Sequence, residues 1–162
     1  MREPRRLIGF ETSEVLRKYI LATSKNMRKE PIKVIVDSNA LFAPLQFKID
    51  VFGELERLLN RRFEMILLSP VKCELELLAE KGSPKTRKMA SCALKLAESF
   101  KYIKVNYETS MQEVDDQIIR TAVVWKAPVF TNDMHLRQRL RDISVPVIYV
   151  RQKSRLEIDG KL

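Results

Sequence analysis

Short apolar runs alternate with amphipathic stretches along most of this chain. Five such runs predict buried strands, at residues 33–37, 64–68, 102–105, 127–130 and 145–150. The stretches between them predict helices, at about residues 48–60, 69–81, 84–99, 115–126 and 133–142. Parallel strands need crossover connections of this length. The pattern therefore predicts an α/β fold with a central parallel sheet of about five strands.

Serine–proline pairs mark the start of two of these helices. Ser69-Pro70 and Ser83-Pro84 each combine an N-cap hydroxyl with a proline at the first helical position. Gly82 ends the first of the two helices. Two consecutive helices are therefore expected between the second and third strands.

The first 31 residues look like an extension of the domain. They are rich in arginine and then predict a helix at about Thr12–Lys29, which Pro31 ends. The apolar stripe of this helix is formed by Val15, Leu16, Tyr19, Ile20, Thr23 and Met27. Such a stripe would pack on the domain, on a second copy of the chain or on a partner. We therefore divide the chain into a basic N-terminal extension (1–31), a folded domain (32–155) and a C-terminal tail (156–162).

The charge of the chain narrows the range of its partners. Its 30 Lys and Arg residues outnumber 21 Asp and Glu residues, which gives a net charge of +9 and a pI near 9.7. A basic domain of this size attracts a polyanion, and nucleic acid is the first candidate. The plainer alternative is a basic protein without such a ligand. No run of 18 apolar residues is present, so we expect no membrane span.

Cysteine usage and the first residues predict a cellular compartment. Cys73 and Cys92 have neither CxxC spacing nor histidine partners, which predicts reduced thiols packed in helices. The positively charged start is not followed by the apolar segment of a signal peptide. Both features predict a cytoplasmic protein.

Four acidic residues follow four different predicted strands: Asp37, Glu74, Asp116 and Asp133. Because ligands of open parallel sheets bind at the carboxyl ends of the strands, the fold would bring these acids together. Each acid taken singly has an ordinary alternative. Asp37 would close a strand, Glu74 would face solvent, and the other two would cap helices. Their common position at one edge of the sheet is the informative observation.

Such a cluster of carboxylates calls for a cation. Neighbouring carboxylates repel one another, so some bind protons or a metal neutralises them. Mg²⁺ or Mn²⁺ suits a site made only of carboxylates, and these ions support phosphodiester cleavage. His135 is the only histidine and lies two residues after Asp133. It is interpreted as a surface or capping residue, with substrate contact as the alternative.

Neighbouring acids compete for two of the four places. On a helical wheel, Glu74 lies at the edge of the buried stripe, whereas Glu76 points to solvent. The wheel does not separate Asp115 from Asp116, because the geometry of a first helical turn is too variable. In the alternative interpretation, one of these two aspartates only caps the helix.

Four short motifs resemble those of PIN domains, a family of ribonucleases. The segments are Val34–Leu41, Ser69–Leu75, Val114–Ile119 and Phe130–Asp133, in chain order. The likeness covers about residues 32–152. It implies a PIN-like three-layer α/β/α fold and an endoribonuclease that uses Mg²⁺ or Mn²⁺.

The resemblance also implies roles for individual residues. It makes Asp37, Glu74, Asp116 and Asp133 catalytic and metal-binding, with Asp115 as the alternative metal ligand at the third position. Around these acids, it implies that four polar residues support the loops: Ser38, Asn39, Thr131 and Asn132.

Within PIN domains, Asn132–Arg141 followed by Val145–Tyr149 resembles the rRNA-processing branch, the nuclease of the small-subunit processome and its single-domain archaeal relatives. This implies an rRNA precursor as the RNA substrate and allows a homodimer or a ribosome-assembly partner. VapC toxins share the four acids but usually lack this basic helix and strand. A VapC-type toxin ribonuclease with an antitoxin partner stays open, as does a non-catalytic RNA-binding ribosome-assembly factor.

Basic residues near the predicted site are candidates for RNA binding. Three lie on the last predicted helix and three follow the last predicted strand: Arg137, Arg139, Arg141, Arg151, Lys153 and Arg155. Arg137 and Arg141 share a helix face, where they would repel by a few tenths of a kcal/mol unless a phosphate backbone lies nearby. A solvated surface is the alternative.

Overall fold

The computed structural model describes residues 14–18, 21, 30–106 and 111–162. The contacts of the chain divide it into two units, Met1–Pro31 and Ile32–Leu162. In the first unit, residues 14–18 and 21 are helical, and Val15 and Leu16 are exposed. The rest of the predicted apolar stripe lies outside the described residues: Tyr19, Ile20, Thr23 and Met27.

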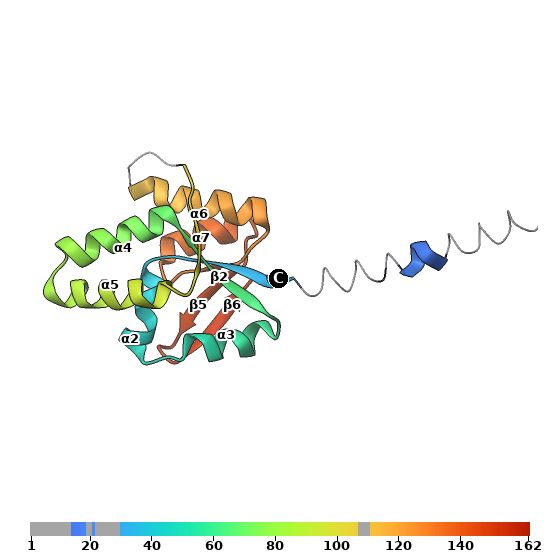
Figure 1. Ribbon diagram of the computed structural model, residues 1–162. Helices are drawn as coiled ribbons and strands as arrows, with labels where there is room; N and C mark the ends of the chain where they lie inside the picture. Colours follow the sequence, from blue (N-terminus) through green and yellow to red (C-terminus); the bar gives the residue numbers. More distant parts are fainter. Residues whose placement is uncertain (1–13, 19–20, 22–29, 107–110) are drawn as a thin grey trace, which may run out of the picture. The chain divides into compact units, whose positions relative to one another are not determined.

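A six-stranded sheet forms the centre of the second unit (Figure 1). Its strands are β1 (Ile32–Val36), β2 (Phe63–Leu68), β3 (Lys101–Ile103), β4 (Val129–Phe130), β5 (Val147–Arg151) and β6 (Arg155–Asp159). Their order is β3-β2-β1-β4-β5-β6. The first five strands are parallel, and β6 runs antiparallel to β5. The predicted parallel sheet is confirmed, with one further strand.

Helices lie on both faces of this sheet. β1 is followed by the 3₁₀ helix η1 (Asn39–Phe42) and by α2 (Ala43–Phe47) and α3 (Val51–Leu59). β2 is followed by α4 (Ser69–Lys81) and α5 (Pro84–Ala97). α6 (Met111–Trp125) follows β3, and α7 (Met134–Asp142) follows β4. Figure 1 shows α6 and α7 on one side of the sheet and α3 on the other, while α4 and α5 pack side by side. The predicted three-layer α/β/α fold is confirmed. No described helix is long and apolar enough to cross a membrane.

The central strands consist of apolar residues because helices cover both of their faces. Val34, Ile35 and Val36 of β1 are completely buried, as are Ile66 and Leu68 of β2. Side chains that alternate between the two faces of β1 are thus removed from water on both sides. This buried centre holds the carboxyl ends of β1 and β4 in place, where the candidate site begins.

Both helices begin where the serine–proline pairs predict, but the predicted N-cap is right at one serine and wrong at the other. The Ser83 hydroxyl accepts a hydrogen bond from the Thr86 amide at 3.3 Å, so it caps α5 as expected. In α4, Leu68 occupies the N-cap position instead of Ser69. The Ser69 hydroxyl accepts a hydrogen bond from the Val105 amide at 2.9 Å, which ties the chain beyond β3 to the start of α4.

The helix predicted at about residues 48–60 corresponds to α3, which begins later than predicted. Asp50 caps α3 by accepting a hydrogen bond from the Gly53 amide at 3.1 Å. Lys48, the predicted first residue, has a φ of 53°, which is incompatible with a right-handed helix. The segment between Asp37 and Lys48 forms η1 and α2, two short helices that the hydrophobic pattern did not predict.

Both cysteines lie on the paired helices α4 and α5, and no disulfide joins them. Cys92 is half-buried, in agreement with a thiol packed in a helix. The predicted packing of Cys73 is wrong because this residue is exposed. It follows the buried Val71 by two positions, which is about 200° around the helix and therefore on the opposite side.

The predicted C-terminal tail is a strand of the sheet. Leu156 on β6 is completely buried. Its amide donates a hydrogen bond to the Glu54 carboxylate at 3.0 Å, and its carbonyl accepts one from Arg57 at 3.4 Å, so α3 holds the strand. The turn before β6 places Gln152 and Lys153 at φ values of 51° and 55°. Hairpin turns of this kind usually contain Asn or Gly, which is why the sequence did not indicate a hairpin.

We expect Leu156→Ala to destabilise the domain by about 2–5 kcal/mol, because it removes a completely buried side chain and leaves a cavity. Denaturant unfolding measures this change. The matched control is Leu162→Ala, since Leu162 is 60% exposed and its loss should alter the free energy of unfolding very little. Equal stability of the two variants would contradict the packing of β6 into the core of the domain.

Candidate active site

The candidate site lies where the order of the strands reverses. The chain moves from β1 through β2 to β3 on one side, and then returns to β4 on the other side of β1. In such sheets a crevice opens at the carboxyl ends of the strands on either side of the reversal. Asp37 directly follows β1, and Asp133 follows β4 by three residues. The fold therefore places these two acids on opposite sides of the crevice.

Asp37 is held rigidly at the bottom of the crevice. Asp37 is only 5% exposed to solvent. One carboxylate oxygen accepts a hydrogen bond from the Ser38 amide at 2.8 Å, and the other accepts one from the Thr131 hydroxyl at 2.7 Å. The Thr131 hydroxyl in turn accepts a hydrogen bond from the Asp133 amide at 3.1 Å. A single hydroxyl thus links the two acids across β1 and β4.

Two asparagines connect the same loops. The Asn39 side-chain oxygen accepts a hydrogen bond from the Asn132 amide at 3.0 Å. The Asn132 side-chain oxygen accepts one from the Val150 amide at 2.9 Å, which extends the connection to β5. The Ser38 hydroxyl donates a hydrogen bond to the carboxylate of Glu74 on α4. The four residues of the predicted loop-supporting set therefore join β1, β4, β5 and α4 around the crevice.

A cavity of about 660 Å³ opens above Asp37. All five candidate acids line it, together with neighbouring polar and apolar residues: Asp37, Glu74, Asp115, Asp116, Asp133, Ser38, Asn39, His135, Arg139, Phe42, Leu78 and Val114. Sequence reasoning did not single out the apolar members Phe42, Leu78 and Val114, because apolar residues in helices usually indicate core. The cavity is thus a polar floor with one partly apolar wall.

Asp133 has a structural role in addition to its place in the cavity. Its Oδ1 atom accepts hydrogen bonds from the amides of His135 and Leu136, at 2.8 and 3.1 Å, and so caps α7. Both hydrogen bonds are made by the same oxygen. Asp133 therefore caps a helix, as the alternative interpretation expected, and also lines the cavity.

Asp115 and Asp116 occupy different environments. The helix α6 begins at Met111, so both lie beyond its first turn and neither caps it. Asp116 forms an ion pair with Arg139 at 2.6 Å. The charge of Asp115 raises the pKa values of Asp37 and Glu74, and the charge of Asp133 raises that of Asp115. Both aspartates line the cavity, and the motif-based preference for Asp116 stays a prediction.

Burial and mutual repulsion raise the pKa values of the central acids. Removal from water raises the pKa of Asp37 from 3.8 to about 6, and the charges of Glu74 and Asp115 add to this, against the hydrogen bonds from Thr131 and Ser38. Burial is also the main reason why the pKa of Glu74 and that of Asp115 are raised. Negative charge therefore accumulates here at a cost in free energy, which a bound cation would offset.

The donor set fits a hard cation. Carboxylate oxygens are the ligands that Mg²⁺ and Mn²⁺ prefer. In their present positions, no three acidic, histidine or cysteine side chains in the described part of the chain are grouped closely enough to hold a metal ion. Shared coordination therefore requires side-chain rotation. Asp37 is fixed by its hydrogen bonds, and the Oδ1 atom of Asp133 is held by the two amides that it caps in α7, so rotation falls mainly to the half-buried Glu74.

Arginines of α7 are paired with carboxylates of the protein itself. Arg137 and Arg141 both contact Asp159 of β6, at 3.3 and 3.1 Å. Arg137 also lies over the ring of Tyr149, with 3.5 Å between the guanidinium carbon and the ring centroid. Asp159 thus relieves the repulsion that the sequence predicts between the two arginines. Arg139 differs because it lines the cavity, next to Asp116.

The cations around the β5–β6 hairpin are arranged in a similar way. Arg151 and Arg155 both contact Glu157 of β6, at 2.8 and 3.2 Å. Lys153 is exposed in the turn between the two strands. The unpredicted strand β6 therefore supplies two carboxylates that contact four of the six candidate RNA-binding residues and offset half of their positive charge. Of these six, Arg139 is the one that the structure places among the acids.

His135 is exposed and lines the cavity. It lies close enough for its positive charge to lower the pKa of Asp115. Its backbone amide takes part in the cap of α7 through Asp133. The side chain thus has the surface position expected from the sequence, and it also borders the space that a substrate would enter.

The raised pKa of Asp37 predicts a pH-dependent difference in stability between the wild type and Asp37→Asn. The folded state binds this proton more tightly than the unfolded state, so stability is lost as pH rises from about 4 through 6. Because each pKa unit corresponds to about 1.36 kcal/mol, the penalty reaches about 3 kcal/mol. In chelator, Asp37→Asn should therefore gain stability over the wild type between pH 4 and 7, as measured by urea unfolding. A constant difference across this range would contradict the burial of a charged Asp37.

The chain is similar to PIN domains in sequence and in structure. Residues 34–153 match the family described as "PIN like domain". Ribonuclease VapC4 of Methanocaldococcus jannaschii is 36% identical over 129 residues, which cover 79% of this chain and 97% of the relative. Ribonuclease VapC9 of Archaeoglobus fulgidus is 30% identical over 125 residues, which cover 77% and 87%. The solved structure of the PIN domain endonuclease Utp24 matches with a TM-score of 0.67 and 28% identity, over 82% of this chain and 94% of that one. The resemblance seen in the four motifs is confirmed, and this chain belongs to the PIN domain family.

Proposed function

We propose that this chain is a divalent-metal-dependent endoribonuclease that hydrolyses RNA phosphodiester bonds in the cavity of about 660 Å³. The observation that carries this proposal is that acids from four different strand–helix junctions line this one cavity. The relatives named as ribonucleases and the neighbour named as an endonuclease support the class of reaction. The net charge of +9 supports a polyanionic substrate.

Each acid has a defined task in this proposal. A bound Mg²⁺ or Mn²⁺ would supply a Lewis acid that activates water and stabilises the charge that develops on the phosphate. Asp37 is the fixed ligand, because hydrogen bonds from Ser38 and Thr131 orient both of its oxygens. Glu74 and Asp133 approach from α4 and from the start of α7. Glu74 would complete the set of ligands by rotating toward Asp37, and Asp133 would contribute its carboxylate while its Oδ1 atom still caps α7.

Asp115 is the third acid of the proposed metal site, in preference to Asp116. Its charge acts on Asp37 and Glu74, the charge of Asp133 acts on it, and burial already raises its pKa. Asp116 instead holds the guanidinium group of Arg139 at 2.6 Å. We assign Asp116 the positioning of Arg139, whose charge would contact the phosphate backbone at the cavity.

The class of RNA has two candidates. The motifs of α7 and β5 resemble the rRNA-processing branch, which favours an rRNA precursor and a ribosome-assembly partner. The relatives named ribonuclease VapC4 and VapC9 favour a VapC-type ribonuclease with an antitoxin partner. We place the rRNA precursor first. Mapping of the cut sites in total RNA distinguishes the two classes. Cuts confined to precursor sequences support an rRNA-processing enzyme, whereas cuts in mature RNAs support a VapC-type ribonuclease.

Cleavage of a labelled RNA in Mn²⁺ or Mg²⁺ tests the assignment of the acids. Asp37→Asn and Asp115→Asn should each lower the rate more than about 100-fold, because each removes a metal ligand. Asp116→Asn should lower it about 10-fold, since it only releases Arg139. The matched control is Glu76→Gln, because Glu76 lies on the exposed side of α4 and pairs with Lys72. If Asp116→Asn is as inactive as Asp37→Asn while Asp115→Asn retains activity, the assignments of the two neighbours are reversed.

Thermal unfolding tests the metal site without any cleavage. Mn²⁺ at about 100 times its dissociation constant should stabilise the wild type by about 2.7 kcal/mol relative to chelator. Asp37→Asn should lose most of this gain, because it removes the fixed carboxylate, whereas Glu76→Gln should keep it. An equal gain in Asp37→Asn would mean that the ion binds elsewhere, and the proposed site would have to be abandoned.

A further inference from the structure

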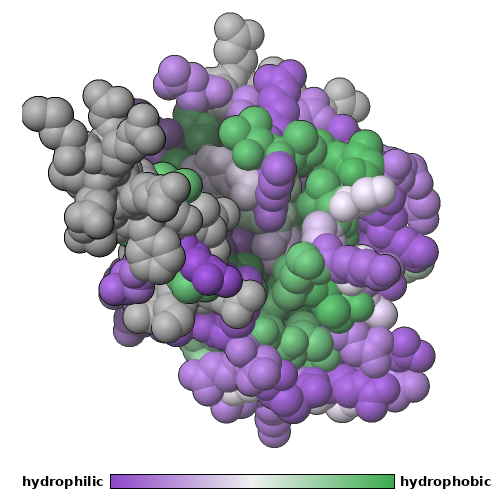
Figure 2. Space-filling view, turned by 90° about the vertical axis from the view of Figure 1, so that its right-hand side faces the viewer, coloured by the Kyte–Doolittle hydropathy of each residue, from purple (hydrophilic) through white to green (hydrophobic). Residues whose placement is uncertain are grey.

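A second cavity lies at the opposite edge of the sheet from the acids. It has a volume of about 800 Å³ and is formed around the amino ends of β2 and β3, next to α3. Figure 2 looks onto the side of the molecule at which β1 and β2 begin, and it shows hydrophobic surface between hydrophilic side chains. None of the residues that line this cavity belongs to the candidate active site.

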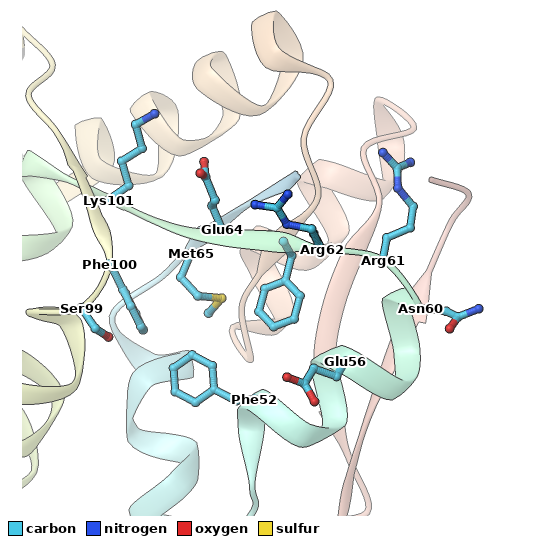
Figure 3. A pocket seen from close by; sticks show the side chains of 11 residues that line it. Phe52, Glu56, Asn60, Arg61, Arg62, Glu64, Met65, Ser99, Phe100 and Lys101 are labelled. Atoms are coloured by element: carbon cyan, nitrogen blue, oxygen red, sulfur yellow. The ribbon is translucent and has the colours of Figure 1, made fainter. Parts of the chain in front are cut away.

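Aromatic side chains form one part of this second cavity. Figure 3 shows Phe52, Met65 and Phe100 pointing toward one another beneath β2. The rings of Phe52 and Phe100 meet edge to face, with centroids 6.1 Å apart and an interplanar angle of 73°. Phe52 nevertheless remains 37% exposed. Part of its ring surface therefore borders the cavity, where a flat aromatic group would stack on it.

Cations form another part of the cavity. Arg61 and Arg62 lie in the loop before β2, and Lys101 begins β3. Figure 3 shows all three on the side of β2 that is opposite Phe52. The side chains of Arg62 and Lys101 are exposed to solvent. Because β3 pairs with β2 only from Ile66 onward, the edge of β2 before Ile66 is not covered by β3, and a ligand that passes this edge would have phosphate groups near the cations and its apolar part near the rings.

Two carboxylates also line the cavity. Glu64 lies on the same side of β2 as Arg62 and Lys101 (Figure 3), and its register partner Lys33 on β1 has its ammonium group over the Trp125 ring. Glu56 is exposed at the end of α3, on the same side of β2 as Phe52 (Figure 3). A carboxylate at this position would repel a phosphate but would accept hydrogen bonds from the amino groups of a nucleobase. Stacking surface, cations and a carboxylate acceptor together match the parts of a nucleotide.

We propose that this cavity binds one nucleotide from a single-stranded stretch of the RNA substrate. The base stacks on Phe52 with its amino groups toward Glu56, and the adjacent phosphates lie on Arg62 and Lys101. The volume of about 800 Å³ is that of a small-molecule site, for which about 300–1,000 Å³ is usual. A base within a duplex would not enter it, because only unpaired bases can be splayed out in this way.

The proposal rests on the proposed function for its substrate, and it adds a second point of contact. The two sites lie at opposite ends of β2, which rises by roughly 17 Å from Phe63 to Leu68. A mononucleotide in the second cavity therefore does not reach the acids. A single strand of several nucleotides contacts both, so the cavity would set the distance between a recognised base and the bond that is cut.

Binding of RNA to the full chain tests this proposal. All measurements use the Asp37→Asn background in chelator, so that no RNA is cut. The probes are a labelled 12-nucleotide single strand, a hairpin of the same composition and the four nucleoside monophosphates. The cavity variants are Phe52→Ala, Phe52→Leu, which stays apolar, and Arg62→Glu with Lys101→Glu. The matched control is Lys85→Glu with Lys88→Glu, which makes the same change in net charge on the exposed side of α5.

The proposal predicts losses that are confined to the cavity variants. Both changes at Phe52 should weaken binding of the single strand about 5- to 100-fold, which is the usual effect of losing one base–aromatic stack. The Arg62→Glu, Lys101→Glu pair should lower the slope of log K against log salt by about 1.4, since two phosphate contacts are lost. The control pair should lower the slope less, and the hairpin should bind more weakly than the single strand.

Several results would overturn the proposal. Equal losses in the cavity pair and the control pair would show general attraction to a basic surface. Unchanged binding in both Phe52 variants would exclude stacking, and amide NMR shifts at the cavity with a polyglutamate peptide but not with RNA would indicate a protein partner. If the wild type cuts RNA while the cavity variants bind it normally, only this inference fails. If the chain neither binds nor cuts RNA, the proposed function fails with it.

Discussion

The hydroxyl group of Thr131 is the contact on which the geometry of the site depends. It donates a hydrogen bond to Asp37 and accepts one from the Asp133 amide, at 2.7 and 3.1 Å. The residues that it joins follow two strands that are neighbours only in the folded sheet. Because Thr131 is completely buried, water does not compete for these hydrogen bonds. Removal of the hydroxyl would leave polar groups in the loops without a hydrogen-bond partner. The fixed Asp37 then serves as the reference point for the other acids that line the same cavity.

Much of this arrangement was predictable from the sequence, and the exceptions have physical reasons. Alternating apolar runs predicted the parallel strands, and Asp37 and Asp133 could be placed because each follows a strand closely. The strand β6 was missed because Gln152 and Lys153 form its turn with positive φ values, without the glycine or asparagine that usually indicates one. Asp115 could not be distinguished from Asp116, because the start of α6 at Met111 is not marked by any apolar pattern. A shift of four residues in that start changes which side chains face the cavity.

The missed strand changes the electrostatic picture of the whole domain. Asp159 and Glu157 of β6 each contact two arginines, so two negative charges offset half of the positive charge that these four arginines contribute. These pairs are partly exposed, and each is worth little in stability. Their effect is to orient the guanidinium groups and to lower the net field around α7. The attraction of the basic chain for a polyanion therefore depends more on its other cations than the sequence motifs suggested.

The double role of Asp133 bears on how members of such a family diverge. Its Oδ1 atom caps α7, and an asparagine at this position would cap the helix equally well. The side-chain charge could thus disappear while the helix, the sheet and the surfaces around them stay in place. An enzyme and a binding protein that only recognises the same ligand would then differ by one oxygen replaced by one nitrogen. On this fold, the loss of the Asp133 charge would cost almost nothing in stability, so under the proposed function only selection for the reaction would keep an aspartate at this position.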